Sequence, residues 1–370
     1  MKKRISNMCL LALLILAQPA GLAQFQGPND FEQTPSQDEN SPQGSDNVGG
    51  AGNAQGAAPG GMGGRFRNGS RWQSLSPEQK KQIIQRVRAR RQAGATGMNS
   101  QAAPANLDNV AIQNDVAYGA DPLQRLDVYS PKNKSANQAL PICIFVHGGG
   151  WSRGDKNQGD RKTKGCAYVA ENIVFVSTNY RLAPNVMHPK QVQDIAQAIA
   201  WVKKHAPEFG GDPNKIFIMG HSAGAHLVDL VATNDKYLTE AGLSLKDIKG
   251  VISLDTASLN LTTRRNDDGP ETGLVGPMID TAFGKDPAVL KDGSPTLSIK
   301  PGKTYPPFLM FCGSRRTNCV QQHRDFEAAM HKVGGQVTVT PVPLSHADVN
   351  RASGQPGTEV YKGCMQMIKG

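Results

Sequence analysis

A serine flanked by small residues stands between a segment typical of a buried strand and a segment typical of a helix. The motif at 220–224 reads Gly-His-Ser-Ala-Gly, follows the apolar run 215–219 and precedes residues 223–233. Small neighbours permit a strained turn that pushes a serine hydroxyl away from the backbone, as in a nucleophile elbow. We therefore predict that Ser222 is a nucleophile and that the N–H of Ala223 is one donor of an oxyanion hole.

A second glycine-rich motif, His-Gly-Gly-Gly-Trp at 147–151, follows the apolar run 142–146. Glycines let backbone N–H groups approach a developing oxyanion without obstruction by a side chain. The motif lacks the Lys-Ser/Thr ending of a phosphate loop. We predict that Gly149 and Gly150 supply oxyanion donors. The N–H of Trp151 is an alternative donor, and its side chain is a candidate substrate contact.

A serine hydroxyl needs a base that removes its proton, and histidine is the usual base. His346 lies in a predicted loop between the last strand and the last helix, late in the chain, where the order serine, acid, histidine would place it. His323 and His331 fall in a predicted helix and are expected on its surface. His221 and His226 flank the serine and are expected to pack.

The elements that must position these residues begin near residue 108, where short apolar runs alternate with amphipathic segments of helix length. This alternation predicts an α/β class with a mostly parallel sheet between helices, and both glycine motifs follow strands, where such a sheet carries its chemistry. The predicted strands are 110–117, 125–130, 140–146, 173–178, 215–219, 250–254, 307–312 and 336–341. The predicted helices are 160–171, 190–206, 223–233, 320–333 and 357–369. Residues 256–306 are predicted to form loops and short helices over the mouth of the site, with a polar rim.

Residues 112–370 resemble α/β-hydrolase carboxylesterases, in particular secreted feruloyl and acetyl-xylan esterase-like proteins and hormone-sensitive-lipase-like proteins. Besides the two glycine motifs, the matching stretches are Asp121-Pro122, Leu126-Asp127-Val128-Tyr129, the residues 179–184, His188-Pro189, Asp194 and Gly211-Asp212-Pro213. The resemblance implies an α/β-hydrolase fold with an eight-stranded, mostly parallel sheet. It also implies ester hydrolysis and a structural role for Asp194 before the elbow.

The acid of the expected triad is missing from its usual place. In the resembling family it follows the strand at 307–312 in a Gly-x-x-Asp loop, but here Arg316 stands at that position. No acidic residue occurs between Asp292 and Asp325. The acid must therefore come from another element, or an uncharged group must replace it.

Three residues are candidates for orienting the imidazole. Asp255 ends the strand before the missing acid, and some α/β-hydrolases take their acid from that strand; we favour it. Asn318 could hold His346 by an uncharged hydrogen bond, and Asp325 could reach back from its helix, which is the least favourable geometry. Asp255 could instead only bond its own loop.

The incomplete triad leaves two classes of function open. We favour a serine carboxylic ester hydrolase acting through an acyl-enzyme on Ser222, on short-acyl esters or on feruloyl or acetyl esters of carbohydrates. The alternatives are a weakened or inactive binding module on the same fold, and an amide or formamide hydrolase. No His-Glu-x-x-His motif or paired-cysteine spacing appears, so we expect neither a metal nor a cofactor.

The N-terminal third has a different composition from the rest. Residues 1–23 combine three basic residues with a short apolar run and predict a cleaved signal peptide, hence a secreted or periplasmic protein without stable membrane insertion. Residues 24–71 predict a disordered linker, and 72–105 a basic helix, at about 77–93, with a connector. That helix could contact an anionic surface or merely act as a spacer. The catalytic domain is expected at 106–370.

The distribution of charge argues against nucleic acid as a partner. The net charge of the chain is +10, but only +4 of it lies in residues 92–370, and +8 lies in residues 65–91. The basicity therefore belongs mainly to the segment before the predicted domain.

Five cysteines remain after the predicted cleavage, so an oxidising compartment would leave at least one thiol free. Cys143 and Cys312 lie in apolar strand-like runs and are expected to be buried. A disulfide, if one forms, is expected between Cys319 and Cys364.

Overall fold

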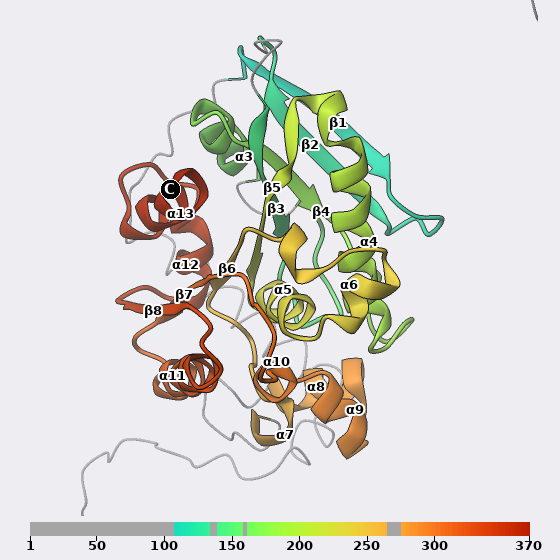
Figure 1. Cartoon of the computed structure of the whole chain (residues 1–370), viewed down its shortest axis with the longest axis vertical. Coiled ribbons are helices and arrows are strands. Elements are labelled where there is room, and N and C mark those ends of the chain that lie inside the picture. The colour runs from blue at the N-terminus through green and yellow to red at the C-terminus, as the bar shows by residue number, and fades with distance from the viewer. Residues whose placement is uncertain (1–106, 134–138, 158–160, 265–274) are drawn as a thin grey trace, which may run out of the picture. The chain divides into compact units, whose positions relative to one another are not determined.

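The computed structural model describes residues 107–133, 139–157, 161–264 and 275–370 (Figure 1). All of them belong to one of the two units of the chain, which runs from Arg88 to Gly370. The predicted signal peptide, linker and basic helix lie outside the described residues. Within the described part, no helix is both long enough and apolar enough to cross a membrane.

A single eight-stranded sheet forms the centre of the domain, in the order β1-β2-β4-β3-β5-β6-β7-β8. β1 and β2 pair antiparallel with their neighbours, and the other five pairings are parallel, which confirms the predicted α/β class. The strands are β1 Val110–Ala117, β2 Arg125–Pro131, β3 Leu140–Val146, β4 Val174–Thr178, β5 Gly211–His221, β6 Gly250–Leu254, β7 Phe308–Gly313 and β8 Val337–Val342.

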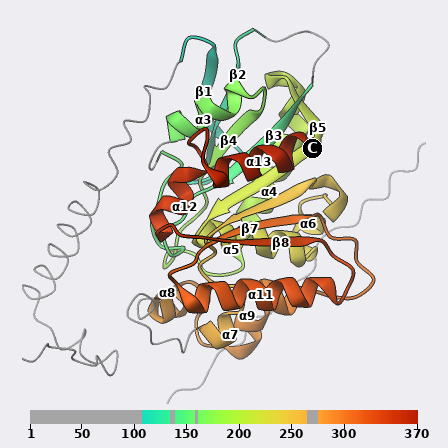
Figure 2. The ribbon, with the colours of Figure 1, turned by 90° about the vertical axis from the view of Figure 1, so that its left-hand side faces the viewer.

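Helices cover both faces of the sheet because the central strands are apolar on both sides. In β3, Ile144 belongs to the hydrophobic cluster under one layer of helices, and its neighbours Cys143 and Phe145 belong to the cluster under the other. The first layer contains α4 Lys190–His205, α5 Ala223–Thr233 and α11 Thr317–His331, with the short α6 Lys236–Glu240, η2 Ala206–Phe209 and η3 Leu245–Asp247 beside it. The second layer contains α3 Arg161–Ala170, α12 His346–Ala352 and α13 Glu359–Lys369. Figure 2 shows α13 lying across the strands.

Two of the differences from the sequence-based prediction lie in elements that carry the site. β5 begins at Gly211 rather than at 215, because Gly211 pairs with Leu140 of β3. His346, expected in a loop, is the first residue of the short helix α12. The Ser345 hydroxyl caps this helix by accepting from the N–H of Asp348, and Ser-x-x-Asp is a sequence signal for a helix start that the prediction did not use.

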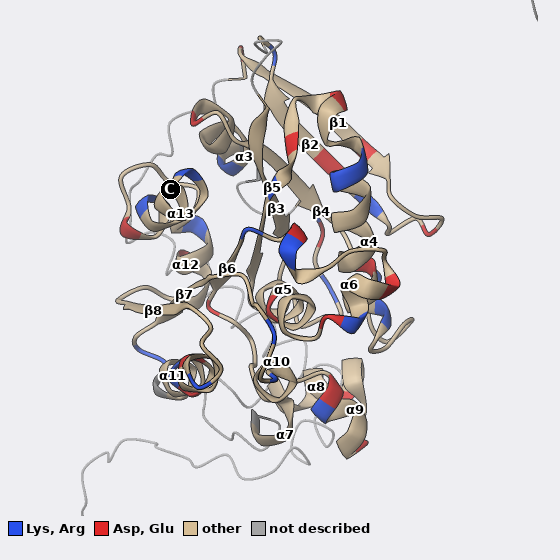
Figure 3. Ribbon diagram, viewed as in Figure 1, with Lys and Arg blue, Asp and Glu red and all other residues tan. Residues whose placement is uncertain are grey.

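The long segment between β6 and β7 forms short helices joined by loops, as predicted for its described part. These are α7 Leu261–Arg264, α8 Val275–Phe283, α9 Pro287–Asp292 and α10 Pro295–Ser298. They lie together at one end of the domain in Figure 1. Figure 3 shows acidic and basic residues intermingled on the helices, whereas most central strands carry no charge.

The cysteines are buried, and the predicted pair is not joined. All five cysteines of the described residues are free thiols. Cys319 belongs to the cluster under α11 and Cys364 to the cluster on the opposite face, so the proposed Cys319–Cys364 bridge is wrong. The burial expected for Cys143 and Cys312 is confirmed, since neither is exposed.

The expectation of a surface position for His323 is also wrong, whereas His331 is exposed as predicted. His323 is buried, and its Nδ1 lies 2.6 Å from the carbonyl oxygen of Cys319 one helical turn earlier. The positions 319, 323, 326 and 330 repeat at helical spacing, and all four face the core. That spacing, which includes Phe326 and Met330, was the signal for burial.

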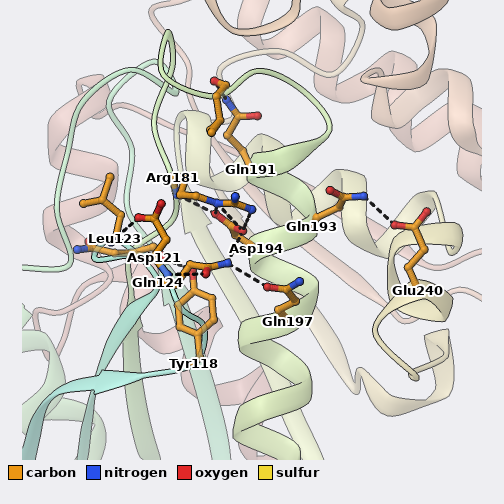
Figure 4. Close-up of polar contacts among 12 residues, drawn as sticks. Tyr118, Asp121, Leu123, Gln124, Arg181, Gln191, Gln193, Asp194, Gln197 and Glu240 are labelled. Atoms are coloured by element: carbon orange, nitrogen blue, oxygen red, sulfur yellow. Dashed lines mark hydrogen bonds and ion pairs between the residues drawn. The ribbon is translucent and has the colours of Figure 1, made fainter. Parts of the chain in front are cut away.

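An ion pair with a buried carboxylate ties α4 to the segment that follows β4. Arg181 donates to Asp194 through its backbone N–H at 2.9 Å and through Nη2 at 2.6 Å, and the Gln124 amide donates at 2.8 Å (Figure 4). The Asp194 carboxylate has no exposed surface. Its position is that of a structural residue, as the resemblance implied.

We expect Asp194→Asn to lower the free energy of unfolding by about 1–3 kcal/mol, because it weakens the charge-assisted hydrogen bonds from Arg181 to a buried side chain. Urea unfolding followed by circular dichroism measures this loss. Glu240→Gln is the matched control: Glu240 accepts from Gln193 at 3.0 Å on the exposed side of α4, and its loss should cost less than about 0.5 kcal/mol (Figure 4). Equal losses in the two variants would contradict the structural role.

Candidate active site

The predicted elbow has the backbone that its sequence requires. Ser222 joins β5 to α5 with φ 56° and ψ −117°, a conformation that a residue other than glycine rarely adopts. A side chain at Gly224 would collide with the carbonyl of Val146, so the helix can approach β3 only with glycine there. The small residues around Ser222 thus permit both the turn and the packing behind it.

Asp255 stands beside the elbow at the end of the neighbouring strand. In the parallel register of β5 and β6, His221 pairs with Leu254. Ser222 follows His221 and Asp255 follows Leu254, so both residues come directly after the same pair. The N–H of Ser222 donates to the Leu254 carbonyl at 3.0 Å. Asp255 also has a positive φ of 52°, so both strands turn sharply at the same level of the sheet.

The structure brings His346 to this pair. Nδ1 of His346 lies 2.5 Å from Oδ2 of Asp255, and His221 Nε2 donates to the backbone carbonyl of His346 at 2.9 Å. The His221 and His346 rings are 4.5 Å apart, which fixes the imidazole next to the residue that precedes Ser222. His221 therefore has the packing role expected of it.

The other candidate acids lie elsewhere. Asn318 is exposed in the first turn of α11. Asp325 is exposed on the same helix and accepts from Gln321 at 2.8 Å. Of the three candidates, Asp255 is the carboxylate within hydrogen-bond distance of the His346 ring.

The Asp255 carboxylate is buried and receives several donors. Oδ1 accepts from the N–H of Gly313 at 3.0 Å and from the Cys319 thiol at 3.0 Å, and Oδ2 accepts from Arg316 Nη1 at 2.6 Å. Burial alone would raise the pKa of Asp255. The His346 hydrogen bond, the Arg316 charge and the Cys319 thiol outweigh burial and hold the pKa well below its usual range. Asp255 is therefore an anion under all ordinary conditions.

The glycine loop after β3 approaches the elbow closely. A side chain at Gly148 would come within 3.0 Å of the Ser222 Cβ. Gly149 and Gly150 have φ of +131° and +61°, and their N–H groups bond no other group of the described residues. The backbone N–H of Trp151 likewise bonds no other group of the described residues, and the Trp151 carbonyl accepts from the N–H of Ala183. This loop can therefore offer N–H groups to an oxygen beside Ser222.

Met278, which the sequence analysis did not single out, lies over this loop. A Cβ at Gly150 would come within 2.5 Å of the Met278 Sδ. Met278 belongs to α8, in the segment expected to offer a polar rim, so the described contact of that segment with the loop is apolar. The sequence of residues 256–306 has no periodicity that would have predicted this contact.

We expect Gly150→Ala to lower kcat for p-nitrophenyl acetate by about 10- to 100-fold, because the added methyl group would come within 2.5 Å of the Met278 Sδ, so that Met278 and the loop must shift beside the donors. The control is Gly242→Ala, since Gly242 has a similar φ of +76° and open space around it. Both variants incur the left-handed backbone cost of about 1–2 kcal/mol, but only Gly150→Ala should lose activity. A full kcat in folded Gly150→Ala would remove Gly150 from the oxyanion hole.

The prediction that the Trp151 side chain contacts substrate is wrong for this structure. Trp151 has no exposed surface, and its Nε1 donates to Nδ1 of His226 at 3.2 Å. The indole also meets Phe283 edge to face, at 5.2 Å between ring centres. The Trp151 side chain and His226 therefore form the packed wall behind the loop.

Asp229 anchors the end of β6 from α5. It accepts from Ser253 and, at 2.9 Å, from Thr256, on either side of the segment that carries Asp255. Burial raises the pKa of Asp229 to about 7, although both hydroxyl groups oppose the shift. The folded protein therefore holds this proton more tightly than the unfolded chain does.

Because the pKa of Asp229 is higher in the folded state, its contribution to stability is greatest below pH 4 and is lost as the pH rises through 7. We expect about 2–3 kcal/mol of stability to be lost through this group between pH 5 and pH 8. Urea unfolding at both pH values measures it in the wild type and in Asp229→Asn. The wild type should show the larger decline, and identical declines would contradict the assignment.

Comparison with known proteins identifies the family. The profile of a family described as BD-FAE matches residues 126–329, more than half of the chain. This chain belongs to the BD-FAE family. The matched range contains Ser222, Asp255 and both glycine motifs, and His346 follows it.

Curated proteins similar to this BD-FAE member include esterases. Esterase LipC of Mycobacterium tuberculosis is 34% identical over 234 residues, which cover 59% of this chain and 55% of LipC. Carboxylesterase NlhH of the same organism is 41% identical over 93 residues, which cover 25% of this chain and 29% of NlhH. The chain thus spans about half or less of the length of these two relatives.

Solved structures show that the fold is that of α/β-hydrolase esterases. Esterase B from Lactobacillus rhamnosis has a TM-score of 0.61 and 22% identity, covering 78% of this chain and 94% of its own. A truncated carbohydrate esterase from gut microbiota has a TM-score of 0.59 and 20% identity, covering 72% and 98%. The α/β-hydrolase fold implied by the resemblance is therefore confirmed.

Proposed function

We propose that the protein is a serine carboxylic ester hydrolase that works through an acyl-enzyme on Ser222. The observation that carries this proposal is the 2.5 Å contact of His346 Nδ1 with the Asp255 carboxylate, next to the strained turn at Ser222. A carboxylate on Nδ1 leaves Nε2 as the base, which is the tautomer that a serine nucleophile requires. The family and its esterase relatives support the same reaction class.

In this mechanism the Ser222 oxygen attacks the ester carbonyl carbon while His346 Nε2 accepts its proton. The carbonyl oxygen becomes an oxyanion, which the N–H groups of Gly149, Gly150 and Ala223 stabilise. His346 then returns the proton to the leaving alcohol as the carbon–oxygen bond breaks. A water molecule, activated by the same imidazole, releases the acid and restores the Ser222 hydroxyl.

We further propose that the acyl group is short, or is feruloyl or acetyl, and that the alcohol is a carbohydrate. The Met278 side chain lies close to Gly150, beside the proposed oxyanion donors, and favours a short acyl group such as acetyl over the bulkier feruloyl group. The predicted export signal favours an extracellular or periplasmic substrate over an intracellular lipid. The basic helix predicted at 77–93 would then add a weak contact with an anionic surface.

A substrate panel tests this proposal. We expect kcat/KM to be higher for p-nitrophenyl acetate than for p-nitrophenyl octanoate, and we expect acetylated xylan or methyl ferulate to be hydrolysed. A preference for the long acyl chain would contradict the substrate class, and faster turnover of a formamide would favour an amide hydrolase. If no ester is hydrolysed and an organophosphonate does not label Ser222, the domain is a binding module.

A further inference from the structure

One oxygen of the Asp255 carboxylate is shared by two nitrogen donors. Arg316 Nη1 lies 2.6 Å from Oδ2, and His346 Nδ1 lies 2.5 Å from the same atom. The two nitrogens are 3.1 Å apart. A guanidinium has no lone pair to accept a hydrogen bond, so with Nδ1 protonated this approach is a convergence of two donors on one acceptor.

The ion pair is shielded from solvent. The Arg316 side chain is 12% exposed and that of Asp255 is fully buried. Water and salt screen buried charges less than they screen surface charges. The Arg316 cation therefore acts strongly on the carboxylate, and more weakly on the His346 imidazole, whose side chain is 40% exposed.

The second carboxylate oxygen is anchored from the same segment. The Cys319 thiol, one helical turn after Arg316, donates to Oδ1 at 3.0 Å, and so does the N–H of Gly313. Burial, together with the charge of Asp255, raises the pKa of the Cys319 thiol well above its usual value, so it stays protonated as a donor. The loop 313–319 thus encloses the carboxylate where related proteins are expected to carry the acid itself.

We propose that Arg316 is a positioning residue of the catalytic acid: it fixes Asp255 against His346 and opposes protonation of the imidazole, so that the base stays active at lower pH. The inference rests on the proposed function, since it assumes that His346 is the base. An opposing cation disfavours the charged imidazole, and an anchored carboxylate preserves its orientation.

Other charged and titratable groups lie on the elements around His346. His221 on β5 lies against the ring, but burial lowers its pKa to about 3, so it is neutral near pH 7. Lys164 on α3 donates to Asn350 of α12 at 2.8 Å. Asp348 and Arg351, on α12 itself, pair with each other. Arg316 differs from these groups in that it bonds the Oδ2 atom that His346 bonds.

The test is the pH profile of kcat/KM for p-nitrophenyl acetate. In Arg316→Met, the acid limb should move to higher pH, because the opposing cation is gone. The plateau should fall roughly 10- to 100-fold, because the carboxylate is less well held. Arg316→Lys keeps the positive charge, so its acid limb should lie close to that of the wild type. Arg315→Met removes the exposed neighbouring arginine and should leave the profile unchanged.

A second measurement does not depend on catalysis. Proton NMR titration of the His346 ring, in a Ser222→Ala background, should give a higher midpoint when Arg316 is changed to methionine, or to glutamine if the methionine variant does not fold. The proposal is overturned if Arg316→Met and Arg315→Met have the same acid limb and the same His346 midpoint as the unchanged chain. Retained hydrolysis in Ser222→Ala would instead overturn the proposed function, while the titration would still decide the effect of Arg316.

Discussion

Ser222→Ala is expected to lower kcat/KM for p-nitrophenyl acetate by about 10⁵- to 10⁶-fold, the largest effect of any single substitution in this protein. The alanine keeps the strained turn but removes the atom that attacks the carbonyl carbon. The remaining rate would come from the oxyanion donors and from substrate binding alone. Stopped-flow and long-time assays of the purified full chain together cover this range.

The matched control for this prediction is Ser258→Ala. Ser258 is a buried serine in the segment after Asp255, and its hydroxyl bonds no other group of the described residues. Its loss should change kcat/KM by less than about threefold. If Ser222→Ala retains a tenth of the activity while remaining folded, the acyl-enzyme mechanism is wrong.

Asp255→Asn is expected to lower kcat by about 10⁴-fold without comparable change in KM. An asparagine amide at this position can donate to Nδ1 of His346 and so stabilise the tautomer whose Nε2 carries the proton and cannot act as a base. The substitution also leaves the Arg316 guanidinium beside a neutral group, so a lower Tm should accompany the loss. Steady-state kinetics at 20 °C and a thermal melt separate the two effects.

Asn318→Ala and Asp325→Asn are the comparisons that make this result decisive. Both residues were candidates for orienting the imidazole, and both are exposed on α11. We expect each variant to keep at least half of the wild-type kcat. A large loss in Asn318→Ala, with Asp255→Asn active, would reverse the assignment of the orienting residue.

The sequence predicts well those features that depend on local pattern. The positions of the central strands follow from apolar runs that are buried on both faces, and the elbow at Ser222 follows from the small residues on each side of it. The glycine loop at 147–151 follows from its place after an apolar run. Each of these features is encoded within about ten consecutive residues, so no knowledge of tertiary contacts is needed to find it.

The features that the sequence leaves open depend on contacts between distant segments. Whether Asp255 reaches His346 is decided by the register of β5 and β6 and by the entry of the chain into α12, a short helix whose start is marked by Ser345 and Asp348 but whose packing is not marked in the sequence. In the sequence, Arg316 marks the absence of the expected acid. In the structure, Arg316 bonds Asp255, the acid that follows β6. Met278 meets the glycine loop through a segment with no regular pattern.

In the proposed mechanism, Ser222 becomes acylated with His346 as its base. Mass spectrometry of the full chain after treatment with a p-nitrophenyl alkylphosphonate tests it most directly, because the reagent forms a stable bond to an activated serine. We predict one adduct per chain, located on the peptide that contains Ser222 and at least 100-fold slower to form in His346→Gln. An adduct on another residue, or no adduct in a chain that is folded, would contradict the account.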